Sequence, residues 1–163
     1  MARRKGARPR TPEELKLIRG FNTALNVVMR QFDADLQRKH RLSHTEYVVL
    51  DWLAESFGHT LGLSDLAARC LQSLSAISRT VGRMESRGLV RREQSTRDAR
   101  AFNAVLTDAG LRLYREATPT HDQSLHRYFI DHLEGIDLEA LSDALHRVIA
   151  AADNRTTVPS PGA

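Results

Sequence analysis

The side chains in this sequence that could do chemistry are mostly arginines, and the arginines are grouped. Residues 69–100 contain eight arginines and three acids, which gives this stretch a charge of +5. Residues 1–10 carry a second +5 with no acid, whereas residues 11–68 and 101–163 carry −2 and −4. A guanidinium group matches phosphate oxygens, and charge segregated in this way favours a polyanionic partner. The alternative from charge alone is a solvated basic face with a disordered tail.

Cysteine and histidine offer less chemistry. Cys70 is the only cysteine, which excludes an internal disulfide and a four-cysteine zinc site and fits a reducing, cytoplasmic compartment. We expect it to be a small core residue rather than a redox switch. His121, His126 and His132 are five and six residues apart, so they do not share a helix face as a metal-binding i, i+4 pair does, and we predict no metal site.

The sequence lacks the motifs of several enzyme classes and of membrane proteins. It has no glycine-rich phosphate loop, no dinucleotide-binding fingerprint and no H-E-x-x-H pair, so we expect neither an enzyme nor a cofactor. The longest apolar run, Val148–Ala152, has five residues, whereas a membrane helix needs about twenty. No apolar segment follows the basic N-terminus, so a secretory signal is not expected either.

Two helix starts carry a capping box, in which a Ser or Thr and a Glu three residues later bond to each other's backbone. The first box, Thr11–Glu14, begins a helix that we expect to end near Lys39, with one apolar stripe. The second, Ser43–Glu46, begins a helix to about Ser56 that is apolar on most sides and is therefore buried. A loop bracketed by Gly58 and Gly62 is expected next, followed by a short helix that Ser64 caps and that ends near Leu71. A polar turn over 72–74 then leads to a helix from about Ser75 to Arg87.

The period of the pattern changes after residue 88. Two short extended runs, Leu89–Gln94 and Ala101–Leu106, are joined by the polar, basic link 95–100, which predicts a two-stranded hairpin. The remaining elements are a helix capped by Thr107 that runs to about Leu133 with a kink at Thr118-Pro119, and a last helix capped by Asp137 that runs to about Ala152.

These elements predict a mainly α-helical protein with a small β-hairpin wing, in the order of a winged helix-turn-helix. A helix fits the major groove of DNA, with its N-terminal residues facing base edges, and an arginine of the wing suits a narrow minor groove. Ile77, Val81 and Met84 are expected to pack inward, while Arg83 and Arg87 reach toward phosphates. The predicted DNA contacts are Ser73, Leu74, Ser75, Ala76, Ser78, Arg79, Arg83, Arg97, Asp98 and Arg100, with Asp98 orienting an arginine.

Several stretches of the sequence resemble the multiple-antibiotic-resistance-regulator (MarR) family of bacterial winged-helix regulators. They are Leu63–Ala67, Ser73–Arg79 and Val81–Arg92, followed by Arg97–Ala101 and Val105–Gly110. Two positions depart from the family pattern. Leu74 stands where the family often has a polar or basic residue, and Gly82 stands where it usually has aspartate. Leucine can contact a thymine methyl but cannot hydrogen-bond to guanine, so the family's operator sequence does not carry over.

The resemblance implies a homodimer whose first and last helices form the dimer lobe, and two recognition helices that bind a palindrome. It also implies a repressor that a small aromatic acid or oxidation relieves, with an effector pocket between lobe and DNA-binding part. His44 and Tyr47 are candidate effector contacts, with ordinary packing or helix capping as the alternative. The predicted dimer contacts are Leu15, Ile18, Phe21, Leu25, Leu138, Leu141, Leu145, Val148 and Ile149.

The expected organisation is one MarR-like domain over residues 11–153, between disordered tails at 1–10 and 154–163. Within it we expect dimerisation helices at 11–39 and 120–152, a winged helix-turn-helix at 43–106 and a connecting helix at 107–133. The predicted function is a cytoplasmic bacterial transcriptional regulator that binds double-stranded DNA. One alternative is an architectural protein whose tail and wing hold phosphates without reading bases, and another is a winged helix that binds proteins and has lost DNA binding.

Overall fold

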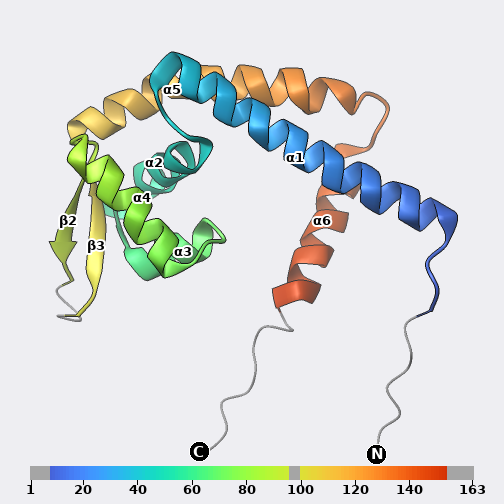
Figure 1. Cartoon of the computed structure of the whole chain (residues 1–163), viewed down its shortest axis with the longest axis horizontal. Coiled ribbons are helices and arrows are strands. Elements are labelled where there is room, and N and C mark those ends of the chain that lie inside the picture. Colours follow the sequence, from blue (N-terminus) through green and yellow to red (C-terminus); the bar gives the residue numbers. More distant parts are fainter. Residues whose placement is uncertain (1–7, 96–99, 154–163) are drawn as a thin grey trace, which may run out of the picture.

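Two long helices, α1 (Pro12–His40) and α5 (Asp108–Tyr128), pack together and connect the two ends of the molecule (Figure 1). The structure is a computed structural model that describes residues 8–95 and 100–153. One end holds α2 (His44–Glu55), α3 (Leu63–Arg69), α4 (Leu74–Ser86) and the sheet β1 (Thr60–Gly62), β2 (Val90–Gln94) and β3 (Phe102–Leu106), and the other end holds α6 (Leu138–Asp153).

Most helix starts lie where the sequence predicts them. The hydroxyls of Thr11 and Ser43 each accept the backbone N–H of the glutamate three residues on at 3.2 Å, and each glutamate accepts the cap residue's own N–H at 2.9 Å. Thr107 accepts from Gly110 at 3.0 Å, and Asp137 accepts from the first backbone N–H groups of α6. Both capping boxes are therefore confirmed, as are the caps at 107 and 137.

The segment between α2 and α3 differs from the prediction. The expected loop contains the 3-10 turn η1 (Phe57–His59) and then β1, which pairs antiparallel with β3 from Thr60↔Val105 to Gly62↔Asn103. Because β1 leads directly into α3, that helix begins at Leu63 with Gly62 as its N-cap. The predicted cap by Ser64 is therefore wrong, and the wing belongs to a three-stranded sheet of order β1-β3-β2.

Two further helix boundaries shift. Helix α4 begins at Leu74 instead of Ser75, because the Ser73 hydroxyl accepts the Ala76 N–H at 3.2 Å and makes Ser73 the cap. Helix α5 ends at Tyr128 instead of Leu133, because Phe129 leaves the helical conformation and the 3-10 turn η2 (Ile130–His132) follows. Pro119 lies inside α5, and the kink predicted there stays a prediction.

The core lies under the short elements, between α2, α3, α4, the sheet and the first half of α5. A buried polar contact then joins α1 to α5, where the Ser124 hydroxyl donates to the Asp35 carboxylate at 2.7 Å. Beyond this point α1 and α6 leave large apolar side chains exposed, and α6 makes few contacts with the rest of the protomer (Figure 1). The terminal helices are thus incompletely packed within one protomer.

Candidate nucleic-acid interface

Helix α4 lies at the surface with one face buried and one face open, as the pattern predicts. Ile77, Val81 and Met84 are fully buried against the core. Ser75 and Arg79 are exposed, and Ala76 and Ser78 are half-buried at the rim of the buried face. With α3 and the turn before it, α4 forms a helix-turn-helix, and we call α4 the recognition helix because its first turn is accessible from outside.

The first turn of the recognition helix presents short polar groups and one apolar side chain. Oγ of Ser73 lies 3.1 Å from Oγ of Ser75, so the two hydroxyls form a pair at the helix start. Leu74 is the first helical residue and is 51% exposed. Hydroxyls that can donate or accept, next to an apolar contact for a thymine methyl, are groups that can discriminate between base edges.

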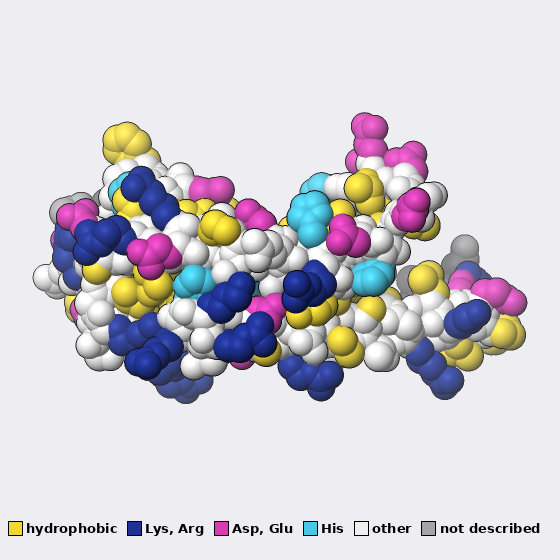
Figure 2. Space-filling view, turned by 90° about the horizontal axis from the view of Figure 1, so that it is seen from above, with side chains coloured by type: hydrophobic (Ala, Val, Ile, Leu, Met, Phe, Trp, Pro, Cys, Tyr) yellow, Lys and Arg dark blue, Asp and Glu magenta, His cyan; other side chains and the backbone are white. Residues whose placement is uncertain are grey.

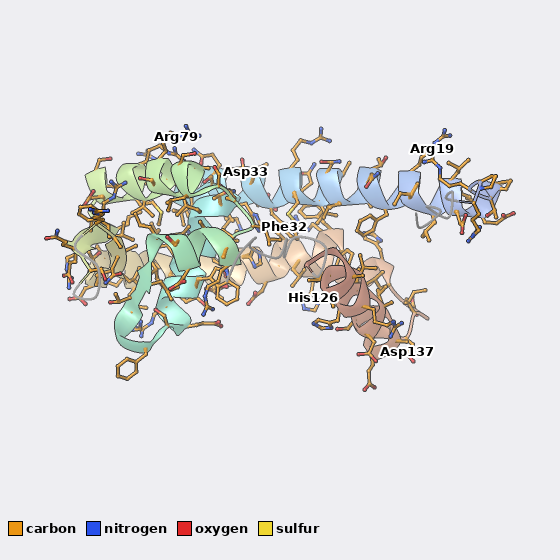
Figure 3. The ribbon with its side chains drawn as sticks, turned by 90° about the horizontal axis from the view of Figure 1, so that it is seen from below. Arg19, Phe32, Asp33, Arg79, His126 and Asp137 are labelled. Carbon is orange, nitrogen blue, oxygen red and sulfur yellow. The ribbon has the colours of Figure 1, made fainter. Side chains whose placement is uncertain are left out.

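Lysine and arginine side chains gather along one long edge of the molecule. Figure 2 shows several of them along the lower rim, over the end that contains α4 and on along α1, and others over the face of the same end. Figure 3 labels Arg79 on α4 and Arg19 on α1, and both point toward this same edge. His126, in the last turn of α5, and Asp137, directly before α6, lie on the opposite side in the same view. The exposed face of the recognition helix is therefore part of an extended positive edge.

Arg83 and Arg87, which were predicted to reach phosphates, both meet Glu46 at the start of α2. Glu46 is buried, and its carboxylate lies 3.3 Å from the Arg87 guanidinium and 3.8 Å from Nε of Arg83. Arg83 also donates to the Thr80 hydroxyl at 3.1 Å. The capping glutamate of α2 thus also holds two arginines of α4, a role that the capping-box motif alone does not indicate. Arg83 remains exposed, and Arg87 is the more enclosed of the two.

Arg92 of β2 lies across the recognition helix, which the sequence did not predict. Its guanidinium donates to the Ser78 carbonyl, its Nε lies 3.6 Å from the Glu85 carboxylate, and its backbone N–H donates to Glu85 at 2.9 Å. A Cβ on Gly82 would lie 3.0 Å from a terminal nitrogen of Arg92. The glycine that departs from the family pattern therefore leaves room for an arginine that ties the wing to α4.

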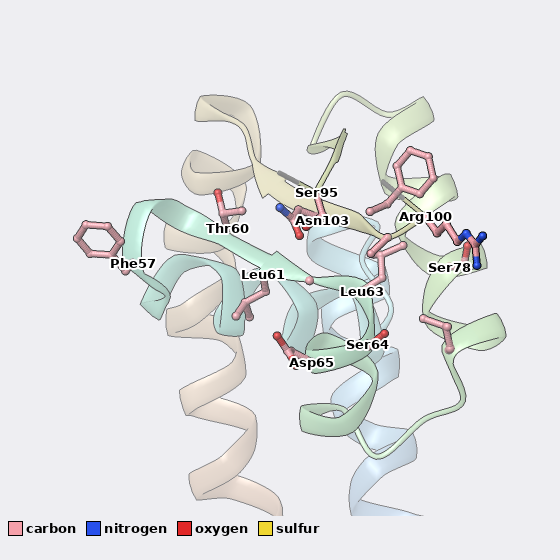
Figure 4. Close-up of a pocket in the computed structure, with 14 residues that line it drawn as sticks. Phe57, Thr60, Leu61, Leu63, Ser64, Asp65, Ser78, Ser95, Arg100 and Asn103 are labelled. Carbon is pink, nitrogen blue, oxygen red and sulfur yellow. The ribbon is translucent and has the colours of Figure 1, made fainter. Parts of the chain in front are cut away.

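The wing is a β2–β3 ladder that runs from Val90↔Leu106 to Gln94↔Phe102. Arg97 and Asp98, predicted to contact DNA from its tip, lie outside the described residues. Arg100 is described and exposed. It borders an open groove of about 760 Å³ between the sheet and the starts of α3 and α4. Figure 4 shows Arg100 beside Ser78 at one end of this groove and Phe57 at the other. Residues next to the wing tip, such as Arg100, and residues of the recognition helix, such as Ser78, thus line the same groove.

The two candidate effector contacts belong to an aromatic cluster where α1, α2 and α5 meet. The Tyr47 ring stacks on His121 at 4.4 Å between centroids, and His44 stacks on His121 at 5.7 Å. Phe32 lies 5.5 Å from His44 and 5.3 Å from His121. Neither His44 nor Tyr47 is among the residues that line the groove beside Arg100, and the stacked rings of the cluster contact one another instead.

Burial shifts the titration of this cluster. It lowers the pKa of His44, an effect that the neighbouring His121 increases, and it lowers the pKa of His121, an effect that Asp122 opposes. Burial also raises the pKa of Tyr114 to about 12, helped by the hydrogen bond that its hydroxyl donates to Asp51 at 2.8 Å. At neutral pH the cluster is thus made of uncharged rings.

The remaining sequence predictions concern metals, cysteine and membranes. Among the described residues no group of three or more His, Cys, Asp and Glu side chains could hold a metal ion. Cys70 packs half-buried against the core, and burial raises the pKa of its thiol, as expected for a packing residue rather than a reactive thiolate. In the described ranges no helix is both long and apolar enough to cross a membrane.

The predicted dimer residues form an apolar surface on α1 and α6. Leu15 and Leu141 are half-buried and the other seven are exposed, up to 66% for Val148. On each helix the exposed members recur at helical spacing and so share one face, and exposed apolar faces of this kind mark an interaction surface. The exposed members are Ile18, Phe21, Leu25, Leu138, Leu145, Val148 and Ile149.

Comparison with known proteins agrees with this architecture. AbsC, a MarR family transcriptional regulator from Streptomyces coelicolor, is 36% identical with a TM-score of 0.84, and the match covers 91% of this chain and 99% of that one. Sco3205, a MarR family regulator from the same organism solved in complex with DNA, is 30% identical with a TM-score of 0.84, covering 91% of this chain and 92% of that one. The regulator BldR from Sulfolobus solfataricus shares the fold at 23% identity and a TM-score of 0.75, over 88% and 99% of the two chains.

The sequence profile of the MarR family matches residues 42–101, and no curated protein matches the chain. The chain therefore belongs to the MarR family of winged-helix transcriptional regulators. These regulators are DNA-binding proteins without enzymatic activity, and they are typically homodimers.

Proposed function

We propose that this protein is a homodimeric, sequence-specific repressor that binds a palindromic operator in the bacterial cytoplasm. The observation that carries the proposal is the exposed first turn of α4, with Arg79 on the positive edge of the molecule. The uncovered apolar surface on α1 and α6 supports a second copy as partner. A two-fold dimer that places one α4 in each of two major grooves requires half-sites about one helical turn, or roughly 10 base pairs, apart.

Each part of the interface has a proposed role. Ser73, Ser75 and Arg79 contact base edges, and Leu74 contacts a thymine methyl. Arg83 contacts phosphate while it stays near Glu46. One arginine of the link 95–100, Arg97 or Arg100, enters the minor groove, and Asp98 orients an arginine. A dimer seated on DNA in this way excludes other proteins from the same site, which is the basis of repression.

Relief by a small aromatic or phenolic effector is part of the same proposal. A planar ring could stack with Tyr47 and His44, the candidate effector contacts. Because His121 already stacks on both rings and Phe32 lies 5.5 Å from His44, an effector ring would have to displace His121 or Phe32 and thereby alter how α1, α2 and α5 pack. A ligand that needs such a rearrangement binds one conformation better than the other, and this is the condition for shifting the protein away from DNA.

The first test is selection of bound sequences from a random duplex pool at about 150 mM salt. We expect an enriched palindrome, and we expect Arg79→Ala to bind it more weakly and with less discrimination from random duplex. An equal loss of affinity for the operator and for random duplex would contradict a base contact by Arg79. If no sequence is enriched and deletion of residues 1–10 abolishes most binding, the protein is architectural instead.

A further inference from the structure

One face of helix α1 neither packs against the core nor belongs to the apolar surface of α1 and α6. Between residues 15 and 32 the helix contains three bases and no acid. Arg19 and Arg30 are eleven residues, or about three helical turns, apart, so they lie on one face. Thr23 and Asn26 lie between them on that face, and all four side chains are exposed. We call this surface the α1 basic face, and its members are Lys16, Arg19, Thr23, Asn26 and Arg30.

This face points the same way as the recognition helix. Arg19 and Arg79 lie on the same edge of the molecule in Figure 3, and Figure 2 shows positive side chains along that edge from one end to the other. Asp33 is the next acid of α1 on this side. One oxygen of its carboxylate accepts the His44 backbone N–H at 2.9 Å, so this oxygen is already hydrogen-bonded within the protein. Positive side chains therefore recur along this edge from α4 to the N-terminal half of α1, with Asp33 as an acid among them.

The dimensions of α1 suit DNA that lies along this edge. At about 1.5 Å per residue, the helix from Arg19 to His40 spans roughly 32 Å, close to one turn of B-DNA. In a two-fold dimer joined through the apolar stripe of α1, the two α1 basic faces would flank the symmetry axis. DNA held by two recognition helices must cross that axis between its half-sites.

We propose that the α1 basic face is a second DNA-binding surface, which contacts phosphates of the operator segment between the two half-sites without reading bases. The inference rests on the proposed function, because it needs a dimer that holds DNA along the positive edge. Its side chains suit the role, since arginine and lysine bind phosphate as cations while threonine and asparagine donate hydrogen bonds. The bases of this segment would then affect binding only through the shape of the DNA.

The test compares the salt dependence of DNA binding for two variants that lose the same charge at different positions and for a third variant that keeps its charge. Arg19→Gln/Arg30→Gln removes two charges per protomer from the α1 basic face. Arg112→Gln/Arg115→Gln is the matched control, since these two arginines are exposed on α5 and belong to neither α4 nor the α1 basic face. Arg19→Lys/Arg30→Lys keeps the charge. Dissociation constants are measured on the selected operator and on a random duplex between 50 and 300 mM salt, after sedimentation confirms folded dimers.

We expect the glutamine pair on α1 to weaken binding at least about tenfold on both duplexes and to leave their affinity ratio unchanged. The slope of log K against log salt is negative and each lost phosphate contact reduces its magnitude by about 0.9, so loss of four arginines per dimer should reduce the magnitude by about 2 to 4. The lysine pair should restore the slope and the α5 control should not change it. A wild-type slope in the α1 glutamine pair, or a loss equal to that of the α5 control, would overturn the proposal.

A second measurement uses the wild-type protein with altered DNA, in case the α1 variants disturb the dimer. Neutral methylphosphonate linkages replace the central phosphates of the operator, and the same number replace phosphates outside the half-sites in a control duplex. We expect only the central replacement to weaken binding, and unchanged affinity would count against the α1 basic face. If the wild-type protein shows no operator preference, the proposed function fails, while the salt slopes on random duplex still decide whether α1 contacts DNA.

Discussion

The guanidinium of Arg92 lies against Gly82, at a position where a Cβ on residue 82 would be 3.0 Å from one of its terminal nitrogens. The same guanidinium donates to the Ser78 carbonyl and meets the Glu85 carboxylate at 3.6 Å. A glycine inside a helix costs about 1 kcal/mol relative to alanine. The contacts that Arg92 makes across α4 offset this cost, and they fix the wing relative to the recognition helix.

Gly82→Asp should stabilise the protein, because the atom that a Cβ at residue 82 would crowd is the far end of the flexible Arg92 side chain, which can shift by a few tenths of an ångström. A carboxylate at residue 82 lies next to the Arg92 guanidinium and can pair with it, and aspartate is also a better helix residue than glycine. We expect a gain of about 1 kcal/mol in the free energy of unfolding, or about 2–4 °C in the melting temperature. In an Arg92→Ala background most of this gain should vanish. A gain of the same size in both backgrounds, measured by urea unfolding, would show that the two residues do not interact.

The local signals in the sequence predicted most of the helix starts, because a cap and its partner are three residues apart. The capping boxes at Thr11 and Ser43 are examples, since each is complete within one turn. The strand β1 was missed for the opposite reason. Its three residues are too few to show an alternating pattern, and they form a strand only because β3, more than forty residues later, pairs with them.

Tertiary partners explain the remaining differences at the candidate site. The outward position of Arg79 follows from helical periodicity, and the structure agrees with it. The pairing of Glu46 with Arg83 and Arg87 depends on how α2 packs against α4, and no spacing in the sequence encodes that packing. Gly82 departs from the family pattern, and the physical reason for a glycine at this position is the Arg92 side chain that lies over it.

Gly110 should tolerate no side chain. It is buried in the first turn of α5, and a Cβ there would lie 2.1 Å from the Leu89 carbonyl oxygen and 2.7 Å from a methyl carbon of Leu106. Backbone must move to relieve such an overlap, so we expect Gly110→Ala to cost about 3 kcal/mol. Gly20→Ala is the matched control, because nothing lies within 4 Å of its Cβ position. That change should raise stability by up to about 1 kcal/mol. Urea unfolding of both variants decides, and a neutral Gly110→Ala would contradict the tight packing.

Stability should fall as the pH is lowered through 6.5, because His44 and His121 resist protonation in the folded state. Burial lowers the pKa of both rings, and His121 lowers that of His44 further, whereas Asp33, Asp51 and Asp122 act in the opposite direction. Below the ordinary histidine pKa of 6.5 the unfolded chain therefore binds protons that the folded chain does not. Each such proton lowers the free energy of unfolding by up to about 1.4 kcal/mol per pH unit, until the lowered folded-state pKa is reached.

The measurement is urea unfolding at pH 5.5, 6.5 and 7.5 for the wild type and two variants. His44→Asn/His121→Asn should flatten the dependence above pH 5.5. His146→Asn, which removes an exposed histidine of α6, should leave the wild-type dependence intact. If the free energy of unfolding of His44→Asn/His121→Asn still falls with pH as in the wild type, the pH dependence arises from other groups of the protein.

Placing a charge on the apolar surface of α6 should separate the two copies without unfolding either. Val148 is 66% exposed in the protomer, so Val148→Glu creates no buried charge there, but it would bury one in a dimer formed through α1 and α6. We expect the variant to sediment as a folded monomer at concentrations where the wild type is a dimer. Its operator affinity should fall by at least about a hundredfold, because one recognition helix then binds without its linked partner. Phe57→Glu is the control, since Phe57 is a fully exposed apolar residue of η1 that belongs to neither α1 nor α6, and it should remain dimeric. A dimeric Val148→Glu would show that the protein does not assemble through this surface.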